Sequence, residues 1–139
     1  MKKMINISFI YALAAMAGGV FYREFTKFQS YTGVTALGKV HTHLFMLGTF
    51  VFLAAALFYD KCSLENSKKF RIFLFLYNIG VSLTAIMLAV RGITQVLGTS
   101  LSAGANASIS GVAGIGHILT GVGFIMFFLA LKEGAESGK

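Results

Sequence analysis

Four long apolar segments, separated by polar stretches, dominate the hydrophobic pattern of this chain. They cover about residues 5–21, 40–59, 70–90 and 111–131. A helix needs about 20 apolar residues to cross a hydrocarbon core of about 30 Å, and each segment comes close to that length. Only helices and closed barrels satisfy the backbone in lipid, and unbroken runs of this length are not barrel strands. The pattern therefore predicts an all-α fold, a four-helix transmembrane bundle that forms a single domain over residues 1–139.

The polar stretches between the apolar segments differ in character. Segment 23–39 is polar, and segment 60–69 is short and charged. Residues 98–108 are rich in Gly, Ser, Ala and Asn, which predicts a flexible loop. We expect the tail, 133–139, to be disordered. The chain has no proline, so the helices are predicted to run without interruption.

Lysine and arginine are distributed unequally between the two ends of the predicted bundle. One end carries Lys2, Lys3, Lys61, Lys68, Lys69, Arg71, Lys132 and Lys139, and the other carries Arg23, Lys27, Lys39 and Arg91. Positive residues are enriched on the cytoplasmic side of membrane proteins. We therefore predict a multi-pass protein of the plasma membrane, embedded in the lipid bilayer with both termini in the cytoplasm.

An alternative interpretation of the N-terminus is a cleaved signal peptide. Two lysines, an apolar run and the segment 14–17, Ala-Ala-Met-Ala, follow the order of a signal sequence and its cleavage site. However, the apolar run continues to Phe21, and its removal would leave three spans with a mismatched charge bias. A retained first span is therefore the favoured interpretation.

The composition agrees with a membrane protein and argues against several functions. The chain is 56% hydrophobic and 12% charged, whereas soluble proteins carry about 25% charged residues. The net charge of +7 comes mainly from the ends of apolar segments, so we do not expect nucleic-acid binding. The single Cys62 cannot form an internal disulfide. No catalytic triad, phosphate-binding loop or pair of carboxylates within the membrane is visible, so an enzymatic function is not indicated.

The three histidines of the chain carry the strongest functional signal. His41, His43 and His117 all lie in or beside apolar segments. A polar or ionisable side chain at membrane depth is costly and usually has a partner or a function. Imidazole is also the side chain that most often binds haem iron or a transition metal. We therefore treat the three histidines as candidate ligands.

Helical phase places these histidines on defined faces. The face of the fourth segment that contains His117 is made of Ser110, Ala113, Gly114, His117, Gly121, Phe124 and Phe128. On the second segment His41 shares a face with Gly48, whereas His43 lies about 200° around an ideal helix. His41 and His43 therefore cannot both point at one centre. Depth favours His43 as the partner of His117, and the small-residue face favours His41, so the pairing stays open.

Two histidines on facing helices of a four-helix bundle predict a b-type haem site near the outer leaflet, for electron transfer or for sensing of a gas, the redox state or haem. Imidazoles on opposite sides of the macrocycle would be the axial ligands. Glycine at positions 48, 114 and 121 (Gly48, Gly114 and Gly121) would let the flat ring pass between the helices. Arg91 and Arg23 are the candidates for contact with the haem propionates, because arginine pairs well with carboxylates.

The segment 41–48, His-Thr-His-Leu-Phe-Met-Leu-Gly, resembles a stretch of membrane proteins of the haem–copper oxidase type. The additional histidines of a haem–copper centre are absent, so the resemblance does not imply reduction of oxygen or nitric oxide there. The whole chain resembles a family of small uncharacterised four-span bacterial membrane proteins, most clearly in segments 19–25, 41–48 and 116–121. That resemblance implies the four-span fold but no established activity.

Two other functions are compatible with the same residues. His41, His43 and His117 could bind copper or zinc without haem, if the second helix is distorted enough for its histidines to converge. Alternatively, the protein could be a structural module that packs against a copy of itself or a larger membrane redox partner. On the third segment, Asn78, Ser82, Ala85 and Ala89 form a small polar stripe to which no function is assigned.

Overall fold

The computed structural model of the protein describes residues 1–137, and this part of the chain folds into helices without a strand. The long helices are α1 (Lys2–Phe28), α4 (Lys68–Val96) and α5 (Ala103–Ser137). The second span consists of consecutive pieces, namely η1 (Ala36–Lys39), α2 (Val40–His43), η2 (Leu44–Phe50) and α3 (Val51–Phe58). A short turn, η3 (Leu64–Asn66), precedes α4. Four helices are long and apolar enough to cross a membrane, which confirms the predicted fold class.

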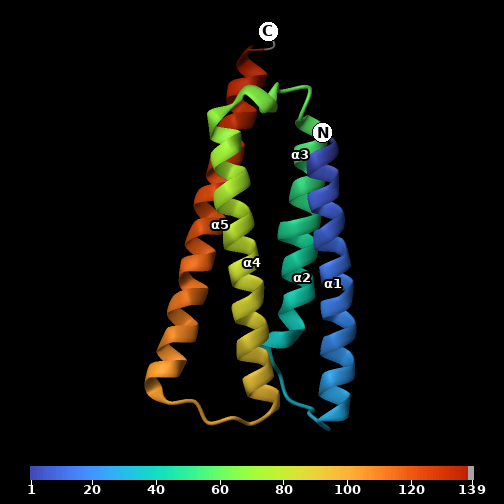
Figure 1. Ribbon diagram of the computed structural model, residues 1–139, viewed down its shortest axis with the longest axis vertical. Helices are drawn as coiled ribbons and strands as arrows, with labels where there is room; N and C mark the ends of the chain where they lie inside the picture. Colours follow the sequence, from blue (N-terminus) through green and yellow to red (C-terminus); the bar gives the residue numbers. More distant parts are fainter. Residues whose placement is uncertain (138–139) are drawn as a thin grey trace.

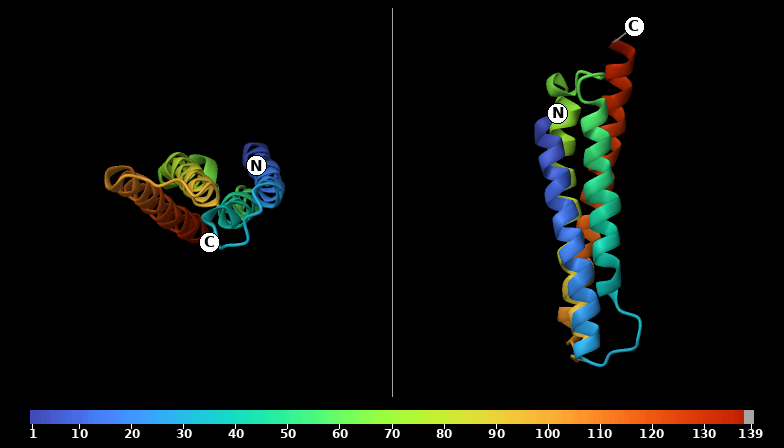
Figure 2. Two further views of the ribbon diagram at one scale, coloured as in Figure 1. Left: turned by 90° about the horizontal axis from the view of Figure 1, so that it is seen from below. Right: turned by 90° about the vertical axis from the view of Figure 1, so that its right-hand side faces the viewer.

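The four spans run side by side and alternate in direction (Figure 1). The first and second spans form one antiparallel pair, and α4 and α5 form another. Both ends of the described chain lie at the same end of the bundle (Figures 1 and 2). At the opposite end, the start of α5 splays away from α4. The cytoplasmic location of the termini stays a prediction from the charges.

Aromatic side chains from several helices form the centre of the core. Phe73 of α4 lies 4.7 Å from Phe127 of α5 and 5.6 Å from Phe52 of α3, measured between ring centroids. Tyr11 of α1 stacks on Phe52 at 5.7 Å. Such pairs bury a large area and contribute about 0.5–1.5 kcal/mol beyond it. The aromatic cluster therefore joins all four spans, including α1.

Close approach of α4 and α5 depends on glycines. A Cβ atom at Gly116 would lie 2.7 Å from Oγ1 of Thr84, and one at Gly123 would lie 2.8 Å from the backbone N of Tyr77. A Cβ atom at Gly80 would overlap the backbone of α5 at Thr120. Small residues of this kind let two membrane helices pack backbone to backbone.

The second span contains a π-helical segment, η2, so the prediction of uninterrupted helices is wrong there. A π turn widens the helix and leaves carbonyls without their usual intrahelical donors. Two neighbouring helices supply donors: the Ser8 hydroxyl of α1 donates to the Thr49 carbonyl at 2.8 Å, and the Tyr77 hydroxyl of α4 donates to the Leu47 carbonyl at 3.0 Å. In lipid such carbonyls require a partner within the protein. Tertiary contacts thus stabilise a distortion that no proline marks.

Several helices extend beyond their apolar cores, which corrects the predicted loops. The first helix continues to Phe28, and α5 already begins at Ala103, inside the stretch predicted to be flexible. The Ser102 hydroxyl accepts a hydrogen bond from the Ala105 N–H at 3.2 Å and caps this start.

The predicted disordered tail is helical up to position 137, whereas 138–139 lie outside the described residues. An ion pair between Lys69 and Glu133 at 3.4 Å holds this end of α5 against α4. Gly134 lies directly against Cys62 in the loop before α4.

The connection before the second span is attached to the end of α4. The Thr35 hydroxyl donates to the Gly92 carbonyl at 3.0 Å, and the Ala36 N–H donates to Oε1 of Gln95 at 2.7 Å. Thr35 also caps η1 by accepting from the Leu37 N–H. These bonds fix where α2 begins and therefore where His41 and His43 lie.

Candidate functional site

His43 and His117 face each other across the bundle. His43 is half-buried on α2, and His117 lies on an exposed face of α5. Their ring centroids are 6.4 Å apart, and the ring planes are inclined by 83°. The two residues come from different spans and are 74 positions apart in the sequence. The structure therefore brings together the pair that depth along the helices favoured.

Both rings are held in the same way by their own helices. Nδ1 of His43 lies 2.9 Å from the Lys39 carbonyl, and Nδ1 of His117 lies 2.8 Å from the Ala113 carbonyl. A carbonyl only accepts, so each Nδ1 carries the proton and the neutral ring presents an unprotonated Nε2. Metal-binding histidines are commonly oriented by a hydrogen bond of this kind from the other nitrogen. The pair thus has the tautomer that ligation through Nε2 requires.

His41 points to another part of the molecule. Its ring stacks on Tyr22 of α1, with centroids 6.4 Å apart and planes inclined by 15°, and it lies against Gly19. Its Nδ1 is buried without a hydrogen-bond partner in the described part of the chain. No group of three His, Cys, Asp or Glu residues in that part could hold a metal ion together. The predicted three-histidine metal site is therefore not formed, because the distortion of the second span does not turn His41 towards His43.

The glycines predicted to line a cofactor slot fall into two groups. Gly114 and Gly121 lie on the His117 face of α5, and a Cβ atom at either position would meet nothing within 4 Å. Gly48 is filled by α1 instead, because a Cβ atom there would lie 2.5 Å from Cδ1 of Tyr11. Gly48 therefore serves helix packing and does not line the space beside the histidine pair.

Arg91 and Arg23 also differ in their surroundings. The Arg91 guanidinium bridges the splayed helices by donating to the side chain and the carbonyl of Asn106 and, at 2.7 Å, to the Ser110 hydroxyl. Ser110 lies on the face of α5 that carries His117, about 10 Å further along the axis. The Arg23 side chain is 81% exposed and pairs only loosely with Glu24, at 3.7 Å. Arg91 is thus on the same face as the pair, whereas Arg23 extends from α1 away from the core.

An apolar groove lies further along the same two spans, between the second span and α5. It has a volume of about 280 Å³ and includes Phe50 and Ala54 on one side and Phe124 and Phe128 on the other. Phe124 and Phe128 follow His117 by 7 and 11 positions and stay near its face of α5. The candidate site therefore consists of the two histidines, and a phenylalanine-lined groove lies next along the chain on both spans.

The sequence of the whole chain decides the family. Residues 1–134 match the model of a family described as a protein of unknown function, DUF2871. The chain belongs to this family. No curated protein and no solved structure matches the chain. The family match confirms an uncharacterised family, and membership brings no activity with it.

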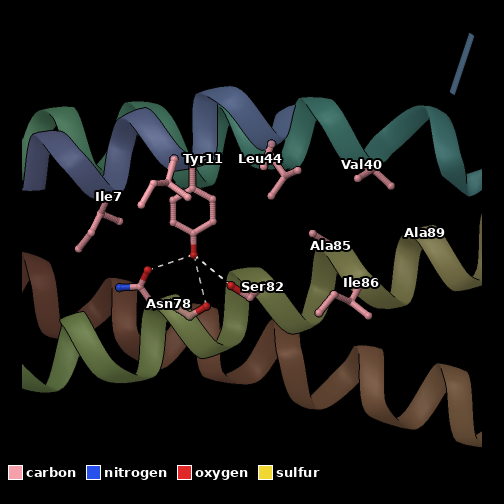
Figure 3. A pocket seen from close by; sticks show the side chains of 11 residues that line it. Ile7, Tyr11, Val40, Leu44, Asn78, Ser82, Ala85, Ile86 and Ala89 are labelled. Carbon is pink, nitrogen blue, oxygen red and sulfur yellow. Dashed lines mark hydrogen bonds between the residues drawn. The ribbon is translucent and has the colours of Figure 1, made fainter. Parts of the chain in front are cut away.

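A second polar site lies between α1 and α4, and the sequence indicated only part of it. The Tyr11 hydroxyl of α1 bonds to Asn78 and Ser82 of α4 beside a groove of about 530 Å³ (Figure 3). The stripe on the third apolar segment contains Asn78 and Ser82. On the first apolar segment Asn6 and Ser8 precede Tyr11 without forming a regular helical stripe with it, so no local pattern distinguished Tyr11.

Proposed function

We propose that this protein is an integral membrane protein that binds one haem b between α2 and α5, with His43 and His117 as axial ligands. The observation that carries the proposal is the pair of facing imidazoles from two different spans, each with Nδ1 bonded to a backbone carbonyl. A polar pair at membrane depth is energetically costly, so it usually has a function. Two neutral imidazoles are a common axial pair of b-type haems.

The separation of the two rings fits ligation of a single iron. With metal–nitrogen bonds of about 2 Å, two imidazoles on opposite sides of one metal have centroids about 6 Å apart. The observed separation is 6.4 Å. The inclination of 83° corresponds to axial imidazoles in perpendicular planes. The pair is therefore spaced for one metal atom between the rings.

The surroundings of the pair suit a flat apolar ring with acidic substituents. Gly114 and Gly121 leave the α5 face open, and Phe50 and Phe124 extend the apolar walls. Arg91 is the cation on this face, and its guanidinium has five N–H donors, so it can bind a carboxylate and keep part of its contact with α5. Haem propionates that point towards Arg91 would supply the carboxylates for this contact.

Two histidine ligands favour electron transfer over binding of a gas. Bound haem would supply one-electron chemistry, and ligation from both sides leaves no open position on the iron. The histidines would hold the group, the phenylalanines would exclude water and Arg91 would balance the propionate charge. We place this function in the plasma membrane of a bacterium with both termini cytoplasmic, as the charge bias supports, and in contact with a larger membrane redox partner or a second copy.

The deciding experiment is an absorption spectrum of the purified protein in detergent, oxidised and reduced with dithionite, after expression with added haem. We expect a Soret peak and, on reduction, sharp α and β bands. His43→Ala and His117→Ala should each lose the six-coordinate spectrum, whereas His41→Ala is the matched control and should keep it. Because His117 is exposed, added imidazole should restore the six-coordinate spectrum of His117→Gly.

The following results would contradict the proposal or favour one of the alternatives. A flat spectrum from folded protein supplied with haem would remove it. Equal loss of haem in all three alanine variants would indicate misfolding or a different ligand pair, which the imidazole experiment separates. Stoichiometric copper or zinc in colourless protein would favour the metal alternative, and absence of any cofactor would favour the structural module.

A further inference from the structure

A second groove lies between α1 and α4, and Val40 and Leu44 of the second span also line it. It has a volume of about 530 Å³ and is mostly lined by apolar side chains such as Ile10, Leu44 and Ile86. Ile10 and Ile86 are about 60% exposed, so the groove opens sideways between the two helices, where the bilayer would be. Its size is within the range of pockets that hold small molecules, about 300–1,000 Å³. A ligand would enter it through the lipid phase.

Three polar side chains interrupt this apolar surface (Figure 3). The Tyr11 hydroxyl lies 3.1 Å from Oδ1 of Asn78, 3.2 Å from Oγ of Ser82 and 3.4 Å from the Asn78 carbonyl. Ser82 is the middle residue of α4, 14 residues from either end, which corresponds to about 21 Å of helix on each side. The polar group therefore lies near the centre of the membrane, where unsatisfied polar atoms are most costly.

The hydrogen bonds within this group leave capacity for a ligand. The one hydroxyl proton of Tyr11 can go to Oδ1 or to the carbonyl of Asn78, and between Tyr11 and Ser82 either hydroxyl can donate. One N–H of the Asn78 side chain goes to the Leu74 carbonyl at 2.7 Å, and the amide has a second N–H. The Ser82 hydroxyl is exposed in the groove and can donate or accept. The group can therefore donate to a carbonyl oxygen and can also accept from a hydroxyl.

The groove also restricts the charge and shape of its ligand. No charged residue lines it, so a neutral head group fits and a carboxylate or an amine does not. A phospholipid head stays at the interface and cannot reach the middle of α4. Towards the Arg91 end the floor is made of small side chains, Ala85 and Ala89, which leave room for an apolar tail.

We propose that this groove binds a lipid-soluble quinone or its hydroquinone, with the ring oxygen at Tyr11, Asn78 and Ser82 and the tail along Ala85 and Ala89. Leu44 lines the groove and directly follows His43, so the groove and the histidine pair share the second span. The choice of a redox-active ligand rests on the proposed function, whereas the polar group and the groove stand without it.

Binding can be measured with a decyl-substituted benzoquinone, by quenching of tyrosine fluorescence in detergent micelles. The wild type should show saturable quenching. Tyr11→Phe with Ser82→Ala should weaken binding at least tenfold, because both hydroxyls that would bond to the ring oxygen are lost. The aromatic ring at position 11 still stacks on Phe52, so the packing is kept. Ala89→Phe should abolish binding by filling the groove, and phenylalanine adds no fluorescence that would mask the tyrosines. Tyr59→Phe, outside the groove, is the matched control and should bind like the wild type.

Two results would overturn the proposal. One is the absence of saturable quenching, or quenching that is equal in the wild type and in both groove variants. The other is full competition by decylbenzene, which has the same tail without oxygens, because the groove would then be a site for lipid chains. Repeating the titration with His43→Ala separates this proposal from the haem proposal: quinone binding without a Soret band retains the groove, and a Soret band without quinone binding retains only the haem site.

Discussion

Single glycines of α5 have opposite roles although they alternate along one helix. Gly116 and Gly123 lie against the backbone of α4, whereas Gly114 and Gly121 meet nothing within 4 Å. Spacing cannot separate the two sets, because both pairs are seven residues apart. The rotation of α5 about its axis decides which glycines pack and which stay open beside His117.

This difference predicts opposite effects of two neighbouring substitutions in haem-free protein. Gly123→Ala should lower the free energy of unfolding by about 1–3 kcal/mol, because its methyl group would overlap the backbone of Tyr77. Gly121→Ala should be neutral or stabilising by up to about 1 kcal/mol, from helix propensity alone. Unfolding in mixed micelles at increasing SDS would measure both. Equal destabilisation would show that α5 is rotated differently.

At the scale of elements, the second span is the one most shaped by its neighbours. Its π-helical segment, η2, receives hydrogen bonds from Ser8 on α1 and from Tyr77 on α4. The segment begins directly after His43 and ends at the groove-lining Phe50, so its widened turn sets the rotation between His43 and the residues that follow. A distortion held by two neighbouring helices is a property of the assembled bundle.

We therefore expect the two donors to stabilise the same element. Tyr77→Phe and Ser8→Ala should each cost about 0.5–1.5 kcal/mol, the usual net value of a hydrogen bond. If η2 returns to α-helical geometry in one variant, the second loss should cost less, so the double variant should be less destabilised than the sum. SDS unfolding of the three variants measures this, with Tyr59→Phe as the control. Strict additivity would mean that η2 keeps its π geometry without these donors.

At the scale of the whole molecule, four alternating spans place both termini and the Cys62 loop at one end. Within residues 1–137, that end carries seven of the eleven Lys and Arg residues. The other end contains Arg91 and its bonds to the start of α5. The charge bias predicts that the Arg91 end faces outwards.

Orientation can be tested with cysteines in intact cells. In a Cys62→Ser background, Thr99→Cys should react with a membrane-impermeant maleimide from outside, and Glu65→Cys should react only after lysis. Both positions lie in connections between helices and are exposed, so reactivity reports the side of the membrane. Labelling of Glu65→Cys in intact cells would reverse the predicted topology.

The sequence by itself determined the number of spans and the all-α class, and it indicated His41, His43 and His117 as candidate ligands. The length of an apolar segment is a local property of the sequence, and a segment long enough to cross the bilayer forms a spanning helix. Helix ends were less predictable, because the start of α5 depends on the Ser102 cap and on Arg91, and its end contacts Lys69 and Cys62.

Only the tertiary structure decided which side chains meet. It paired His117 with His43 rather than His41, filled Gly48 with Tyr11 and joined Tyr11 to Asn78. The reason is that these contacts depend on the tilt and rotation of whole helices. Packing between glycines and aromatic rings that are far apart in the sequence sets those angles, and no local pattern encodes them.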